Sequence, residues 1–278
     1  MVTKEQVKCD YCGRDETDLF RQMGEHTIVE CRHCRLIYVN PRITREELDK
    51  LYSEEYFISH NIQIKDAEHL AWSRLRRRLK IIERFMPDKG KFLEIGCASG
   101  YFLSLAKKSG WDVEGIEYSS FSAERARQML SINVKIGAFN EGVFPPDTYN
   151  VVFMSHVLEH CFEPKRVLAE IYRLLKRNGI VVIEVPNIEA YDLRFHGEKW
   201  KGWQLPYHLY FFSKKTLMQY LESLDFQIAF TTTIGSHYLM RKGKKNPFYK
   251  IAYYFNRFFK VVEGRNLFMI ARRKHRVV

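Results

Sequence analysis

Four cysteines near the N-terminus are spaced to bind a metal ion. They form two Cys-x2-Cys pairs, Cys9 with Cys12 and Cys31 with Cys34, separated by eighteen residues. Each pair can present two thiolates to one ion, and four thiolates complete a closed tetrahedral zinc site. Metal binding would stabilise a segment too small to build its own core. We therefore expect a structural zinc ribbon over residues 1–43, with no zinc position open to a substrate.

Residues 91–117 form a second candidate site, because their order is typical of a nucleotide-binding unit. An apolar strand that carries Glu94 is followed by a turn of small residues between Gly96 and Gly100, a helix, and a strand that ends in Glu117. The two glycines let a ligand approach the backbone and expose the N–H groups at the start of the helix. The pattern predicts the first βαβ unit of a nucleotide-binding α/β domain.

The composition of this turn favours S-adenosylmethionine over other nucleotides. The turn departs from G-x-G-x-x-G because Ala98 stands at the middle position and the last glycine comes one residue early, and no Walker lysine follows. The acid at position 94 would repel a pyrophosphate, whereas it suits a ligand with an amino group. Glu117 lies where a carboxylate would accept both ribose hydroxyls of an adenosine. We therefore expect S-adenosylmethionine rather than NAD or a nucleoside triphosphate.

A largely parallel sheet must position these residues. Short apolar runs predict strands at residues 92–95, 112–117, 133–136, 151–154, 180–185, 226–233 and 266–272. Helical spacing predicts helices between them, including one from Pro164 to Lys176 that Asn178-Gly179 stops. Residues 155–160 leave the carboxyl end of the fourth strand, where open parallel sheets bind ligands. The aromatic and histidine-rich loop 187–213 is typical of a lid or binding loop.

Two further segments flank this sheet. Residues 44–88 predict a helical linker or cap, with a Thr44–Glu47 capping box and a basic helix at 66–85, and the main domain then covers 89–278. Residues 247–262 carry an apolar stripe at helical spacing beside basic residues. This amphipathic helix could pack on the protein or on a second subunit, or it could lie on an anionic membrane.

Composition limits the class of protein. The chain has 278 residues with 46% hydrophobic content, which is enough for one large domain and a small one. It begins without an apolar signal region and contains no apolar run of about 18 residues. Residues 241–278 hold twelve Lys or Arg and one acid, so most of the net charge of +12 lies in the tail. Paired cysteines indicate metal in a reducing compartment, so we expect a cytoplasmic protein.

The motifs together resemble a known family. Residues 89 to about 272 are similar to class I S-adenosylmethionine-dependent methyltransferases, through LEIGCASG with Glu117, MSHVLEH, LLKRNGIVVIEVPN and HLYFFSKKTL. The cysteine ribbon followed by NPRITREELDKLYSEEYF resembles zinc-bearing members of sugar and surface-polysaccharide biosynthesis. Ala98, Glu117 and Tyr149-Asn150 depart from the usual glycine, Asp and Phe-Asp. The resemblance implies a Rossmann-like, seven-stranded α/β sheet with helices on both faces, plus the small ribbon.

The resemblance also implies roles for individual residues. Glu94, Gly96 and Gly100 would shape the pocket for the methionine part of the cofactor, and Glu117 would hold the ribose. The adenine would lie beside Phe139 and Asn140, and Ser155 and His156 would close the site near the sulfonium. The full expected set is Glu94, Gly96, Cys97, Ala98, Gly100, Glu117, Tyr118, Phe139, Asn140, Ser155 and His156.

The acceptor site is less well defined by the sequence. A sulfonium methyl is already activated, so the enzyme must mainly align a nucleophile with the S–CH3 bond. A hydroxyl acceptor would need a base, for which His160 and His208 are candidates, and Tyr56 or Tyr207 could assist. Methylation at carbon would instead require proton removal beside a ketone, and the sequence leaves both reactions open.

Three functions compete. The first is methylation of a sugar or related polar metabolite, such as a glycan-biosynthesis intermediate. The second is methylation of rRNA or tRNA, because zinc ribbons and basic tails also serve RNA. Nucleic acid is disfavoured as a partner because the basic residues lie in the tail, and residues 154–157 do not form an Asn-Pro-Pro-Tyr-like tetrapeptide. The third is a non-catalytic scaffold that keeps the fold, which the nearly complete cofactor motif disfavours.

Overall fold

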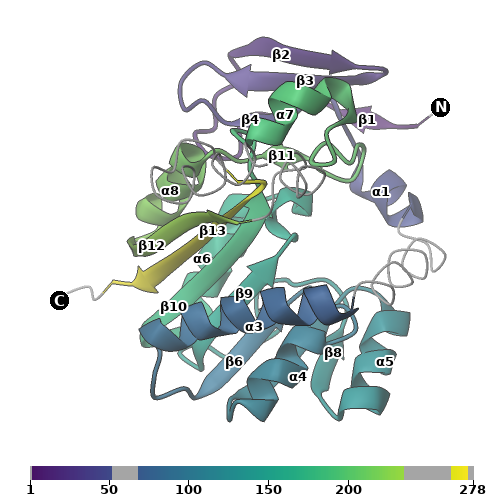
Figure 1. Cartoon of the computed structure of the whole chain (residues 1–278). Coiled ribbons are helices and arrows are strands. Elements are labelled where there is room, and N and C mark those ends of the chain that lie inside the picture. Colours follow the sequence, from purple (N-terminus) through teal and green to yellow (C-terminus); the bar gives the residue numbers. More distant parts are fainter. Residues whose placement is uncertain (1, 52–67, 235–263, 275–278) are drawn as a thin grey trace, which may run out of the picture.

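The computed structural model describes residues 2–51, 68–234 and 264–274 (Figure 1). The predicted helix 247–262, the candidate Tyr56 and residues 52–67 of the predicted linker lie outside these ranges. None of the helices within these ranges is both long and apolar enough to span a membrane.

A seven-stranded mixed sheet forms the centre of the larger part. Its strand order is β12-β13-β10-β9-β6-β7-β8. The bounds are β6 (Lys91–Ile95), β7 (Asp112–Glu117), β8 (Asn133–Ile136), β9 (Tyr149–Ser155), β10 (Leu175–Pro186), β12 (Phe226–Ile234) and β13 (Asn266–Arg273). The neighbours from β10 to β8 are parallel, whereas β13 is antiparallel to both β10 and β12. This sheet confirms the predicted Rossmann-like fold class.

Helices cover both faces of this sheet. They are α3 (Glu68–Phe85), α4 (Tyr101–Lys108), α5 (Ser120–Leu130), α6 (Pro164–Leu174) and α8 (Lys214–Ser223). Because side chains alternate along a strand, Val151 and Phe153 of β9 join one apolar cluster with α3, α4 and α5. Val152 and Met154 join another with α6 and α8. The two clusters form the two halves of the core.

One predicted boundary was wrong. The helix α6 ends at Leu174, two residues before the predicted end at Lys176, and β10 begins at Leu175. Leu175 pairs in parallel register with Tyr149 of β9, and the ladder shifts register before Ile180. The helix therefore ends, and strand pairing begins, before the Asn178-Gly179 turn.

The N-terminal segment packs directly against the sheet domain. The strands β2 (Thr17–Met23), β3 (His26–Cys31) and β4 (Ile37–Val39) form a sheet that β11 (Tyr210–Phe211) completes. A short pair joins β1 (Lys4–Glu5) to β5 (Arg42–Ile43), and α1 (Arg45–Leu51) follows. The Oδ2 atom of Asp10 accepts hydrogen bonds from the Lys165 backbone N–H (3.0 Å) and from the Tyr220 hydroxyl (2.9 Å). The cysteine segment is thus attached to α6 and α8.

Between β10 and β11 the chain forms α7 (Tyr191–His196) and the 3-10 turn η2 (Gly197–Lys199). Another 3-10 turn, η1 (Leu158–His160), follows β9. Figure 1 shows α7 and β11 beside the N-terminal strands. Because β11 pairs with β4, the predicted aromatic loop joins the ribbon to the sheet domain.

A buried ion pair fixes α3 to the sheet. The guanidinium of Arg78 forms two hydrogen bonds with the carboxylate of Glu184 in β10. The Glu184 side chain is fully buried. Burial alone would raise the pKa of Glu184, but the hydrogen bond and the charge of Arg78 hold that pKa below its usual value.

We predict that Arg78→Met strongly destabilises the protein, because it leaves the carboxylate of Glu184 buried without its cation. Loss of one partner of a buried pair typically costs about 3–5 kcal/mol. Arg77→Met is the matched control, since Arg77 is exposed on the same helix, and we expect a change within about 0.5 kcal/mol. Denaturant unfolding measures both, and equal midpoints would contradict the assigned role of the pair.

Candidate active site

One cavity of about 680 Å³ lies at the carboxyl ends of the parallel strands. Six residues of the predicted cofactor set line it: Gly96, Glu117, Tyr118, Phe139, Asn140 and His156. Of the candidate bases, His160 also lines it. The same edge of the sheet therefore brings together residues from four separate connections of the chain.

The glycine turn has the strained backbone that its sequence predicts. Gly96 and Gly100 have φ of 71° and 73°, and Ala98 between them has φ of 47°. A Cβ at Gly96 would lie 2.4 Å from Cγ2 of Val157, so a side chain there would both strain the backbone and collide. Alanine at position 98 therefore adopts a left-handed conformation that glycine adopts more readily.

Glu117 explains why Ala98 is held in this conformation. Its Oε2 accepts a hydrogen bond from the Ala98 backbone N–H (2.8 Å), and its Oε1 accepts one from the Ser119 N–H (2.9 Å). Burial raises the pKa of the Glu117 carboxyl, although these backbone N–H groups oppose the rise. Each carboxylate oxygen has two lone pairs, so each can still accept a ribose hydroxyl. The residue thus fits the predicted ribose-binding role.

Glu94 lies behind the turn rather than in the cavity wall. Its side chain is buried, and its Oε2 has no hydrogen-bond partner within the described ranges. Burial, and secondly the charge of Glu117, raise the pKa of Glu94 well above its ordinary value. An unpartnered buried carboxylate oxygen is costly, and a cationic ligand at the turn would offset that cost. S-adenosylmethionine carries both a sulfonium and an amino group, so the acids at this edge suit it.

The remaining predicted cofactor residues do not line the cavity. Cys97 is buried in the apolar cluster, and its Sγ would lie 2.7 Å from a Cβ at Gly115, so its side chain is directed at the sheet. Ser155 ends β9 and pairs with Glu184. Ala98 and Gly100 form the turn behind Gly96. These residues can shape the site through the backbone but do not form its wall.

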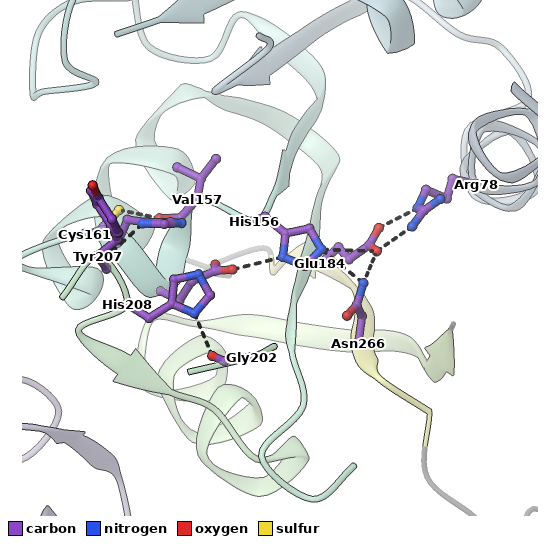
Figure 2. Close-up of polar contacts among 11 residues, drawn as sticks. Arg78, His156, Val157, Cys161, Glu184, Gly202, Tyr207, His208 and Asn266 are labelled. Atoms are coloured by element: carbon purple, nitrogen blue, oxygen red, sulfur yellow. Dashed lines mark hydrogen bonds and ion pairs between the residues drawn. The ribbon is translucent and has the colours of Figure 1, made fainter. Parts of the chain in front are cut away.

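His156 lies at the centre of a polar network that the sequence alone did not reveal (Figure 2). Its Nδ1 is 3.1 Å from Oε1 of Glu159, and its Nε2 is 3.0 Å from Nδ2 of Asn266. Asn266 also donates to Glu184, which binds Arg78. Glu159 belongs to the VLEH motif and could have been noted there. Arg78 and Asn266 come from α3 and β13, and no local pattern marks them.

Opposite charges set the ionisation of this network. Burial lowers the pKa of His156, but the hydrogen bond to Glu159 and the charges of Glu159 and Glu184 outweigh burial and raise it. Burial would raise the pKa of the Glu159 carboxyl, but the hydrogen bond to His156 and the charge of His156 lower this pKa to about 2. His156 therefore compensates a buried carboxylate.

Of the candidate catalytic residues within the described ranges, His160 lines the cavity, whereas His208 and Tyr207 do not. His160 lines the cavity, and its ring packs edge-to-face on His208 at 4.6 Å between centroids. His208 is 2% exposed and does not line the cavity. Tyr207 is also absent from the cavity wall, and its carbonyl oxygen lies 3.1 Å from Nδ1 of His160. Burial, then the charge of His208, lower the pKa of His160 to about 3.

The four N-terminal cysteines converge as their spacing predicts. The Sγ atoms of Cys9 and Cys34 are 3.4 Å apart, and those of Cys12 and Cys31 are 3.6 Å apart. All four Sγ atoms lie within 4.8 Å of one another. A tetrahedral zinc site with Zn–S bonds of about 2.3 Å separates its sulfurs by about 3.8 Å. The cluster is therefore of the right size for one zinc ion.

Comparison with known proteins identifies the family. A family model described as a methyltransferase domain matches residues 67–229, more than half of the chain. The chain therefore belongs to the methyltransferase domain family. With the fold and the cavity, this membership makes the chain an S-adenosylmethionine-dependent methyltransferase.

Individual relatives are distant. An uncharacterised protein of Methanocaldococcus jannaschii is 28% identical over 57% of this chain and 75% of its own length. The malonyl-[acyl-carrier protein] O-methyltransferase of Serratia marcescens is 24% identical over 40% of this chain. The ubiquinone biosynthesis O-methyltransferase of Photobacterium profundum is 28% identical over 38% of it. The matches span 43% and 47% of these two enzymes, less than half of their length.

Solved structures agree on the fold. A methyltransferase of Thermotoga maritima, described as a possible histamine N-methyltransferase, has a TM-score of 0.58 at 19% identity and covers 79% of this chain and 97% of its own. An S-adenosylmethionine-dependent methyltransferase of Archaeoglobus fulgidus has a TM-score of 0.56 at 20% identity, with 78% and 99% covered. At such identities the likeness shows the fold alone.

We predict that Glu117→Gln weakens S-adenosylmethionine binding by about 10–100-fold, since a hydrogen bond to a charged group contributes about 1.5–3 kcal/mol. Asp112→Asn is the matched control, because Asp112 begins the same strand at the opposite edge and its side chain is 70% exposed. Isothermal titration calorimetry measures both affinities. An unchanged affinity in Glu117→Gln would refute the ribose-binding role.

Proposed function

We propose that this enzyme methylates a hydroxyl of a sugar or of a related glycan-biosynthesis intermediate. The observation that carries the proposal is that one cavity joins the cofactor wall to a polar, charged wall. The cofactor wall includes Gly96 and Glu117, and the polar part of the lining also includes Arg45, His160 and Arg166. A hydroxyl-rich acceptor needs many hydrogen-bonding partners, and such a wall supplies them.

On the cofactor side, the chain would bind and orient S-adenosylmethionine. Glu117 would accept hydrogen bonds from the ribose hydroxyls, Phe139 and Asn140 would border the adenine, and the backbone at Gly96 would allow close approach. When bound, S-adenosylmethionine supplies an activated methyl group and leaves as S-adenosylhomocysteine. The rate gain would then come mainly from alignment of the acceptor oxygen with the S–CH3 bond.

On the acceptor side, the cavity wall offers one aromatic ring, Phe162, and two arginines, Arg45 and Arg166. Phe162 lines the cavity, and the guanidinium carbons of Arg42 and Arg45 lie 4.5 Å and 4.6 Å from its ring centroid. Cation–π contacts of this kind hold both the ring and the arginines in place. Arg45 and Arg166 could then bind a phosphate of a nucleotide- or lipid-linked sugar. The acceptor hydroxyl would lie beside His160, which lines the same cavity.

We further propose that Cys9, Cys12, Cys31 and Cys34 bind a structural zinc ion within a ribbon of residues 1–43. The thiol spacing described above supports this site, and four sulfur ligands leave no position for a substrate. Cytoplasmic location and contact of residues 247–262 with a membrane or a second subunit remain predictions from the sequence.

The acceptor class can be tested with methyl-labelled S-adenosylmethionine. We expect label in nucleotide-linked or lipid-linked sugars and none in rRNA or tRNA transcripts, because a cavity of about 680 Å³ suits a small acceptor. Mass spectrometry of the product identifies the methylated oxygen. Label at a sugar carbon would replace the hydroxyl assignment, and label only in RNA would favour the alternative function. Failure to bind the cofactor would indicate a scaffold.

The zinc site can be tested by metal analysis. We expect Cys12→Ser to hold one zinc equivalent fewer than the wild-type protein and to lose about 4 kcal/mol or more of unfolding free energy, because loss of a structural metal is among the largest single-residue effects. Cys97→Ser, a buried cysteine outside the cluster, should keep the wild-type zinc content. Equal zinc contents in both variants would exclude the site.

A further inference from the structure

A second cluster of potential metal ligands lies at the cavity wall. It consists of Glu159, His160 and His208, whose ligand atoms all lie within 4.8 Å of one another. Glu159 and His208 are 1% and 2% exposed, whereas His160 lines the cavity. Glu159 and His160 follow β9, and His208 precedes β11. The fold therefore assembles this cluster from two distant segments, beside the proposed acceptor.

Backbone carbonyl groups orient both imidazoles. Nδ1 of His208 is 2.8 Å from the carbonyl oxygen of Gly202 (Figure 2). Nδ1 of His160 is 3.1 Å from the carbonyl oxygen of Tyr207. A carbonyl oxygen only accepts hydrogen bonds, so each Nδ1 must carry the hydrogen and each Nε2 a lone pair. Metal-binding histidines are usually held through their second ring nitrogen in this way.

Glu159 completes the donor set. Its Oε1 interacts with Nδ1 of His156 at 3.1 Å, while its Oε2 is buried and has no hydrogen-bond partner within the described ranges. Such an oxygen is costly to bury without a cation or a donor. His156 thus holds the carboxylate as an outer partner, and the cluster combines two imidazole lone pairs with one carboxylate oxygen.

We propose that Glu159, His160 and His208 bind one divalent transition-metal ion at the wall of the cavity. Two imidazoles and a carboxylate suit Zn²⁺, Fe²⁺ or Mn²⁺, whereas Mg²⁺ and Ca²⁺ prefer oxygen ligands throughout. Three protein ligands leave coordination positions open, which is typical of catalytic sites. The site differs in this respect from the closed cysteine cluster.

The role of the ion rests on the proposed function. A divalent ion lowers the pKa of a hydroxyl that occupies an open coordination position. The acceptor hydroxyl would lose its proton to water as its oxygen forms a bond to the sulfonium methyl carbon, and the sulfur would keep the electron pair of the broken C–S bond. His160 and His208 would then be metal ligands rather than the bases predicted from the sequence.

Ion binding can be measured without turnover. The full-length protein is titrated with Mn²⁺ and followed by electron paramagnetic resonance, because thiolate clusters select zinc over Mn²⁺. We expect one bound equivalent in the wild-type protein and none in Glu159→Gln or His208→Gln. His156→Ala should bind Mn²⁺ about 10–100-fold more weakly, as expected for an outer partner. Glu163→Gln, an acid of the same cavity outside the cluster, should bind like the wild type.

Calorimetry with S-adenosylmethionine accompanies each titration and shows whether a variant remains folded. Variants that bind the cofactor normally but have lost the Mn²⁺ equivalent support the proposal. Equal Mn²⁺ binding in the wild type and in both ligand variants would overturn it, as would a wild-type protein that binds the cofactor but no ion. A protein that binds the ion but methylates no acceptor would refute the proposed function and leave the metal site intact.

Discussion

Buried carboxylates at the carboxyl edge of the parallel sheet constrain the rest of this structure. Glu94, Glu117, Glu159 and Glu184 lie at or just beyond the ends of four adjacent strands, and all are buried. A carboxylate removed from water needs hydrogen bonds or a cation. The surrounding residues compensate three of these acids, Glu117, Glu159 and Glu184, each in a different way.

The different partners give the acids different roles. Glu117 is held by two backbone N–H groups and faces the cavity, as a ribose-binding residue should. Glu184 is neutralised by Arg78 and thereby fixes α3 to the sheet. Glu159 and Glu94 each keep an oxygen without a partner within the described ranges. An edge with this excess of negative charge suits cationic ligands, and both the methyl donor and the proposed metal ion are cationic.

Local patterns in the sequence predicted most of the helices and strands, and six of the predicted cofactor residues line the cavity. The strand–turn–helix–strand order at 91–117 is set by glycines and apolar spacing, so the turn and Glu117 could be predicted before the fold was known. The cysteine pairs likewise carry their own geometry, because two residues between cysteines bring both sulfurs to one ion. The sequence did not reveal that the side chain of Cys97 packs in the core while its backbone follows the turn.

The sequence by itself determined the fold class, the cofactor turn and the cysteine cluster, since each depends on residues close together in the chain. Only the tertiary structure decided which histidine lines the cavity, because His160 and His208 come from separate segments that meet through the β4–β11 pairing and η1. It likewise brought Arg78 and Asn266 to Glu184 of β10. Hydrogen bonds between distant segments leave no periodic signal in the chain, so packing alone could reveal them.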